Sequence, residues 1–140
     1  MKGDQIPDSD HIARFCRPGQ VAGEQVQATA FMLRSNEKSL SVNWLEFLNC
    51  SSRDREINEI RNIYCAKLNV GARAKIAVLK VGEVREKILT ESPDRRHIEV
   101  LHDPIEDDGS HSEIYNLKQD DELIAELILE TVHEVYPARN

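Results

Sequence analysis

Four polar residues could perform acid–base chemistry or bind a metal. His102 and Asp103 precede an acidic loop, His111 follows it, and His11 lies near the amino terminus. Histidine and carboxylate groups together suit zinc, iron or manganese, and either group can act as a general acid or base. This hypothesis requires His102 and His111 to converge where their strands end. It predicts a small hydrolytic or metal-assisted enzyme that uses His11, His102, Asp103 and His111.

The spacing of these residues matches no established metal or catalytic motif. The chain has no H-E-x-x-H, no Cys/His zinc pattern and no calcium-loop periodicity. His11 and Cys16 cannot form a nucleophile–base pair with each other, because residues five apart leave the shared face of both a strand and a helix. We therefore expect a solvated loop without a bound metal or cofactor, and the sequence leaves open whether the protein is an enzyme.

Asn43 and Glu46 lie in the apolar run Leu40–Leu48 and could contact a partner. A polar side chain in such a run either points to solvent or is buried with hydrogen-bond partners. Trp44 shares its strand face with Leu40, so we expect it to pack in the core. The pattern indicates a strand whose end faces a pocket.

An acidic row is expected on a final helix from about Asp120 to Glu134. Glutamates recur there at steps of four residues, which places them together on the solvent side. Such a row is either a solvated helix face or a strip that attracts a basic partner surface. The predicted partner-binding residues are Glu122, Glu126, Glu130, Asn43 and Glu46.

The composition predicts one domain over residues 1–140. The chain is 40% hydrophobic and 31% charged, an ordinary globular mixture at a common domain size. It contains no run of about 18 apolar residues that could span a membrane. The amino terminus lacks the apolar segment of a signal peptide, and the three cysteines form no C-x-x-C pair. These features predict a cytoplasmic protein with reduced thiols and no membrane contact.

The formal net charge of −7 argues against a nucleic-acid-binding surface. Basic residues are scattered, with Arg95-Arg96 as the only adjacent pair, while acidic residues gather between Asp103 and Glu134. A basic protein partner would be attracted to such a surface.

The order of expected elements is β-β-α-β-α-β-β-α, which favours an α+β fold. We expect a small mixed sheet with about three helices packed mainly on one face. The predicted strands cover residues 26–33, 40–45, 75–81, 97–101 and 111–115, with the first two forming a hairpin. The predicted helices cover residues 52–70, 83–89 and 120–134.

Several cofactor and nucleophile motifs are missing from the chain. It has no phosphate-binding G-x-x-x-x-G-K-[ST], no dinucleotide-binding G-x-G-x-x-G and no G-x-S-x-G elbow. The leading hypothesis is therefore a non-catalytic accessory or binding module that acts through a protein partner.

Four segments together resemble a group of short, uncharacterised bacterial proteins. They are Asp10–Cys16, Ala30–Arg34, Leu40–Glu46 and His111–Ile114, which read DHIARFC, AFMLR, LSVNWLE and HSEI. The resemblance suggests an accessory protein of a bacterial defence locus, and the accessory set beside a CRISPR-linked caspase-like protease is one such locus. The resemblance implies an accessory role in antiviral defence and transfers no catalytic residue.

Overall fold

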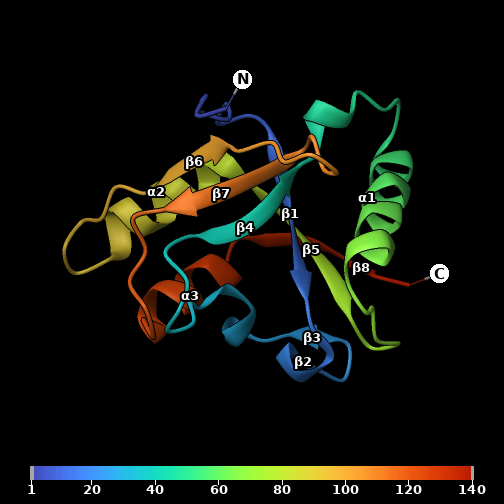
Figure 1. The fold of residues 1–140 in the computed structure, drawn as a ribbon. Helices are drawn as coiled ribbons and strands as arrows, with labels where there is room; N and C mark the ends of the chain where they lie inside the picture. The colour runs from blue at the N-terminus through green and yellow to red at the C-terminus, as the bar shows by residue number, and fades with distance from the viewer. Residues whose placement is uncertain (1, 140) are drawn as a thin grey trace.

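Residues 2–139, which the computed structural model describes, form a six-stranded sheet with helices on both faces (Figure 1). The strands lie side by side in the order β6-β7-β4-β1-β5-β8. Their bounds are β1 His11–Cys16, β4 Leu40–Trp44, β5 Lys75–Lys80, β6 Glu99–His102, β7 His111–Tyr115 and β8 Val132–Pro137. A separate small hairpin joins β2, Val21–Ala22, to β3, Gln25–Val26. The α+β class is confirmed.

All neighbouring strands of the large sheet pair antiparallel, whereas the sequence favoured a mixed sheet. Several neighbouring strands, such as β4 and β7 or β5 and β8, are not consecutive in the chain, so crossover connections bring distant segments together. β1 is one such strand: it was not among the predicted strands, yet it lies between β4 and β5 near the middle of the sheet. Its ladder with β5 runs over six positions, from His11 opposite Lys80 to Cys16 opposite Lys75.

The predicted hairpin of residues 26–33 with 40–45 is wrong. Residues Ala28–Phe31 form a turn of 3₁₀ helix, and β4 pairs with β1 and β7 instead. The alternation in this segment suggested a strand that buries every second residue. The turn instead buries the neighbours Ala30 and Phe31 together, which a strand with one buried face cannot do.

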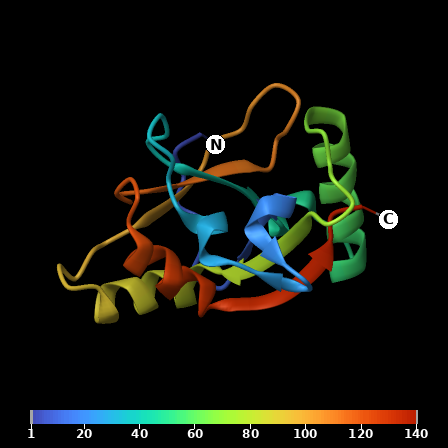
Figure 2. The same ribbon diagram turned by 90° about the horizontal axis from the view of Figure 1, so that it is seen from below.

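Helix α1, Arg53–Lys67, packs on one face of the sheet, and helices α2, Val81–Glu91, and α3, Glu122–Leu129, pack on the other. Figures 1 and 2 show α1 standing apart from the α2–α3 pair in both views. α1 begins after Ser52, whose hydroxyl accepts a hydrogen bond from the Arg55 backbone N–H and so caps the helix. No helix within residues 2–139 is long and apolar enough to cross a membrane.

The apolar cluster under α1 covers only part of its sheet face. Buried residues of α1, β1 and β5 belong to it, but no residue of β6 or β7 does. On the remaining part of that face, β4 and β7 carry polar side chains: Ser41 lies opposite Glu113, and Asn43 lies opposite His111. The fold therefore places a polar strip of the sheet beside the carboxyl-terminal end of α1.

The last predicted helix is too long, because α3 ends at Leu129. The hydroxyl of Thr131 donates to the Ile128 carbonyl at 2.7 Å, and the chain then continues as strand β8 beside β5. Val132 and Val135 continue the apolar spacing of α3, but they are β-branched and suit this edge strand. The acidic row is shorter as a result: Glu130 caps the helix, and Glu134 lies in β8.

Candidate functional site

A cavity of about 230 Å³ lies where strands β1 and β4 part from each other. The two strands pair only at Ile12–Trp44 and Ala13–Asn43, and they separate after these positions. Beyond that point the Arg14 side chain occupies the gap and donates from Nη1 to the Ser41 carbonyl of β4 at 2.8 Å. A side-chain cation thus replaces a backbone ladder bond at the edge of the cavity.

The Arg14 guanidinium is held rigidly and has no anionic partner. Nε donates to the Ala30 carbonyl at 2.8 Å, so two backbone carbonyls fix its plane. Among residues 2–139, no carboxylate lies within ion-pair distance of Arg14, and its Nη2 has no hydrogen-bond partner. Burial lowers the pKa of the guanidinium, but arginine stays charged at neutral pH. The cavity is therefore lined by a cation that lacks a counter-ion.

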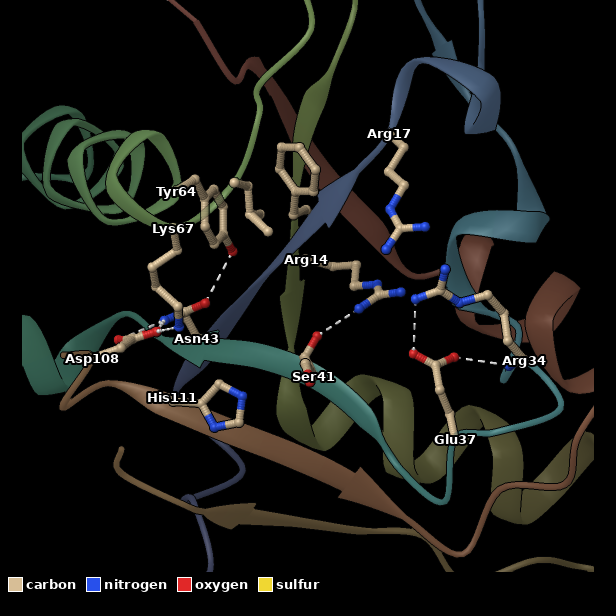
Figure 3. Close-up of a pocket in the computed structure, with 12 residues that line it drawn as sticks. Arg14, Arg17, Arg34, Glu37, Ser41, Asn43, Tyr64, Lys67, Asp108 and His111 are labelled. Atoms are coloured by element: carbon tan, nitrogen blue, oxygen red, sulfur yellow. Dashed lines mark hydrogen bonds and ion pairs between the residues drawn. The ribbon is translucent and has the colours of Figure 1, made fainter. Parts of the chain in front are cut away.

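Two further arginines reach the same end of the cavity. Arg17 follows β1, Arg34 precedes β4, and Figure 3 shows both guanidinium groups turned toward that of Arg14. Glu37 is the acidic residue at this end, and it binds Arg34 through the backbone N–H at 2.8 Å and through Nη2 at 3.2 Å. Three guanidinium charges and one carboxylate leave this end with a net charge of +2. We call it the arginine end.

Glu37 stays ionised beside these arginines. Burial alone would raise the pKa of its carboxyl group, but hydrogen bonds and charge from Arg34, together with the charge of Arg14, lower it. The negative charge of Glu37 is thus committed to Arg34.

The opposite end of the cavity is a closed hydrogen-bond network. Asn43 Nδ2 donates to both Asp108 oxygens, at 3.0 and 2.8 Å, and to Ser110 Oγ at 2.8 Å. The Tyr64 hydroxyl donates to Asn43 Oδ1 at 3.0 Å, and Lys67 Nζ forms an ion pair with Asp108 at 3.3 Å. Burial alone would raise the pKa of Asp108, but its bonds from Asn43 and Ser110 and the Lys67 charge lower it. We call this the lysine end.

The structure places Asn43 inside the lysine end and not on the outer surface. Asn43 is 3% exposed and lines the cavity, as expected for a strand that faces a pocket. Glu46, which was predicted to bind a partner, accepts from the His11 backbone N–H and contacts His11 Nδ1, both at 2.7 Å. This pair joins the start of β1 to the turn after β4.

The predicted convergence of His102 and His111 is wrong. His102 lies opposite Ser112 in the β6–β7 ladder, so it shares the face of Ser112 and not that of its neighbour His111. The buried His102 ring packs against Trp44 and Phe47, with centroids at 5.1 and 4.9 Å. Its Nε2 contacts the Gly109 carbonyl at 2.7 Å.

Of the four residues proposed for catalysis, only Asp103 and His111 come together, and Glu113 joins them. His111 Nδ1 donates to the Asp103 backbone carbonyl at 2.9 Å, and Nε2 lies 3.1 Å from a Glu113 carboxylate oxygen. Ser39 and Ser41 hydroxyls also donate to Glu113, at 2.7 and 3.0 Å. The carboxyl groups of Asp103 and Glu113 and the imidazole offer ligand atoms within 4.8 Å of one another.

The hydrogen bonds of His111 favour a protonated ring. The hydrogen bond to Glu113 is the main cause that raises the pKa of His111. Burial would raise the pKa of Glu113, but His111 and the two serines lower it. A doubly protonated imidazole has no free lone pair, so a metal ion would first have to displace the Glu113 bond. The arrangement is that of an ion pair at the edge of the cavity.

The arginine end was not among the sites that the sequence predicted. Arg14 is a charged residue in the middle of an apolar strand, which is the signal that could have indicated it. Arg17 and Arg34 lie in separate loops and carry no comparable signal.

Comparisons with protein-family models, with curated proteins and with solved structures found no match. The resemblance to defence-associated proteins stays a prediction.

Proposed function

We propose that this protein is a non-catalytic binding module that acts through a protein partner, and that its cavity binds an anionic group of that partner. One observation carries this proposal. The Arg14 guanidinium is fixed by two backbone carbonyls and lacks a counter-ion, while Arg17 and Arg34 point at it.

The fixed geometry favours binding because little freedom remains to be lost. Arg14 already has its orientation, so an anion that reaches it does not have to order that side chain. Hydrogen bonds between guanidinium and an anion are about twice as strong as those between neutral groups. An anion would also relieve the repulsion between the converging arginines. Binding thus has several favourable contributions at this one place.

The positive charge of the arginine end lies within a negatively charged protein, which favours binding of a small anionic group. The whole chain carries a net charge of −7, yet the arginine end carries +2. A long polyanion would meet the surrounding negative surface, whereas a single anionic side chain or terminus would enter the cavity alone. The negative surface around the cavity thus disfavours nucleic acid as the partner.

Titration with simple anions tests the proposal. Acetate, sulfate and inorganic phosphate would be added to isotopically labelled protein while the arginine Nε–H signals are followed by NMR. We expect at least one anion to shift the Arg14 signal in a saturable way. Arg17→Gln should weaken this binding about tenfold, since one charge-assisted contact contributes on the order of 1.5 kcal/mol.

A matched control removes the same charge elsewhere. Arg55 is exposed on α1 and does not line the cavity, so Arg55→Gln should bind the anions as the wild type does. Shifts that spread evenly over surface arginines, or equal losses in the two variants, would exclude a dedicated site.

We also propose that this binding serves antiviral defence, on the basis of the resemblance of four segments alone. Deletion of the gene from its host should then reduce protection against phage, and reintroduction of the Arg14→Gln protein should not restore it. Equal phage sensitivity of the deleted and intact strains would exclude this role.

A further inference from the structure

The cavity also has two apolar lining residues, Phe15 and Leu68, which we call the apolar wall; Leu68 is 41% exposed at the end of α1. The Phe15 ring is supported from the side by Tyr64, with an interplanar angle of 63° and a centroid distance of 5.1 Å. One cavity thus offers a cluster of cations and, beside it, an apolar surface with an aromatic ring.

The charge of the arginine end matches a dianion. Its net charge is +2 after Glu37 has neutralised one arginine. A carboxylate would leave one positive charge uncompensated. A phosphate monoester carries about −1.5 to −2 at neutral pH, so it balances the site.

The directions of the three guanidinium groups also favour a tetrahedral anion. They come from β1, from the loop after it and from the segment before β4, and they approach one point from different sides (Figure 3). A planar carboxylate is satisfied by one guanidinium fork in its own plane. A phosphoryl group presents three oxygens in different directions, so it can accept from all three arginines.

The volume of the cavity limits the size of the ligand. About 230 Å³ is below the range of roughly 300–1,000 Å³ that is usual for drug-sized ligands. It suits one modified side chain or a small ester.

We propose that the cavity binds a phosphate monoester that carries an aromatic ring, with the phosphoryl group at the arginine end and the ring against Phe15 and Leu68. This inference rests on the proposed function and names the class of its ligand. Two sources share this chemistry: a phosphorylated tyrosine side chain of a protein partner and a free nucleoside monophosphate.

Calorimetric titration with a small set of probes tests the ligand class. Phenyl phosphate should bind at least tenfold more tightly than inorganic phosphate, which lacks the ring, and than benzoate, which lacks the second charge. Arg17→Gln should weaken all phosphate probes, and the Arg55→Gln control should weaken none.

A second variant tests the apolar wall without altering the cations. Leu68 is partly exposed, so Leu68→Ser should keep the fold, which a melting curve would check. It should weaken phenyl phosphate severalfold and leave inorganic phosphate unchanged. Equal losses for the two probes, or none for either, would show that the ring does not lie on this wall.

A tyrosine-phosphorylated peptide, its unphosphorylated form and adenosine monophosphate distinguish the sources. Tighter binding of the phosphopeptide assigns the site to a modified partner and supports both proposals. Tighter binding of the nucleotide assigns the site to a free metabolite, which supports the ligand class but overturns the proposal that the anion belongs to a protein partner. Benzoate that binds as tightly as phenyl phosphate would overturn the ligand class while leaving the proposed function intact. If no anion binds at Arg14, both proposals fail.

Discussion

The two ends of the cavity differ in how their charges are balanced. At the lysine end, Asp108 receives hydrogen bonds from Asn43 and Ser110 and an ion pair from Lys67, so its charge is compensated within the protein. At the arginine end, Glu37 compensates only one of three guanidinium groups. Polar clusters of similar composition can therefore serve different purposes. A closed network stabilises the fold, whereas an open one is available to a ligand.

The lysine end ties distant parts of the chain together. Asn43 belongs to β4, Tyr64 and Lys67 to α1, and Asp108 to the loop between β6 and β7. Asn43 and Asp108 are both 3% exposed, so the loss of either leaves the other with a polar group that has lost a buried partner.

The largest expected effect is a loss of stability at the lysine end. Asn43→Ala leaves Asp108 buried without its main donor, which should lower the free energy of unfolding by about 3 kcal/mol. Urea denaturation would measure the change. Asn36→Ala, in an exposed loop, is the control and should have little effect. A loss below about 0.5 kcal/mol in the Asn43 variant would contradict the structural role.

Substitutions at the arginine end should affect anion binding and not stability. Replacing both Arg17 and Arg34 with Gln removes like charges from exposed side chains, so stability should stay within about 0.5 kcal/mol of wild type. Anion affinity should fall by more than tenfold, as titration with phosphate would show. A large loss of stability with unchanged affinity would reverse our assignment of the two ends.

The contribution of the His111–Glu113 pair to stability is intermediate in size and depends on pH. The raised pKa of His111 means that its stabilisation is complete below about pH 6.5 and is lost as pH rises through the native pKa. The lowered pKa of Glu113 means that its contribution is present above about pH 4.3 and is lost as pH falls through the native pKa. The pair therefore stabilises the fold most at about pH 5–6.5.

The His111→Gln variant tests this pH dependence. The variant should lose about 1–2 kcal/mol of stability near pH 5.5, the usual contribution of a hydrogen bond to a charged group, and less near pH 9. Thermal melting at the two pH values would measure the difference. An equal loss of stability at both pH values would indicate that His111 stabilises the fold through packing and not through its charge.

The smallest expected effect on stability concerns the acidic row on α3. Glu122 and Glu126 are exposed and form no ion pair within residues 2–139, whereas Glu130 pairs with Lys87 at 3.0 Å. Reversing Glu122 and Glu126 to Lys should change the free energy of unfolding by less than about 0.5 kcal/mol. If the row binds a basic surface of a captured partner, the reversal should weaken that complex most at low salt. Equal affinities would remove α3 from the interface.

Local signals in the sequence were sufficient for part of the fold. The Ser52 cap and the buried Ile57, Ile60 and Tyr64 define α1, and the continuous apolar run of β5 indicates a central strand. Each of these features depends on neighbours within a few residues. β8 was mistaken for helix because its valines continue the apolar spacing of α3, and only pairing with β5 makes it a strand.

The sequence by itself determined the α+β class and several of the polar groups that surround the cavity, among them Asn43 and His111. Tertiary structure decided which of these groups meet. His102 and His111 separate because alternate residues of antiparallel strands face opposite sides. Arg14, Arg17 and Arg34 meet because β1 and β4 pair briefly and then part. Such long-range pairings depend on the packing of the whole chain, so no local pattern of residues could have predicted which side chains meet in the cavity.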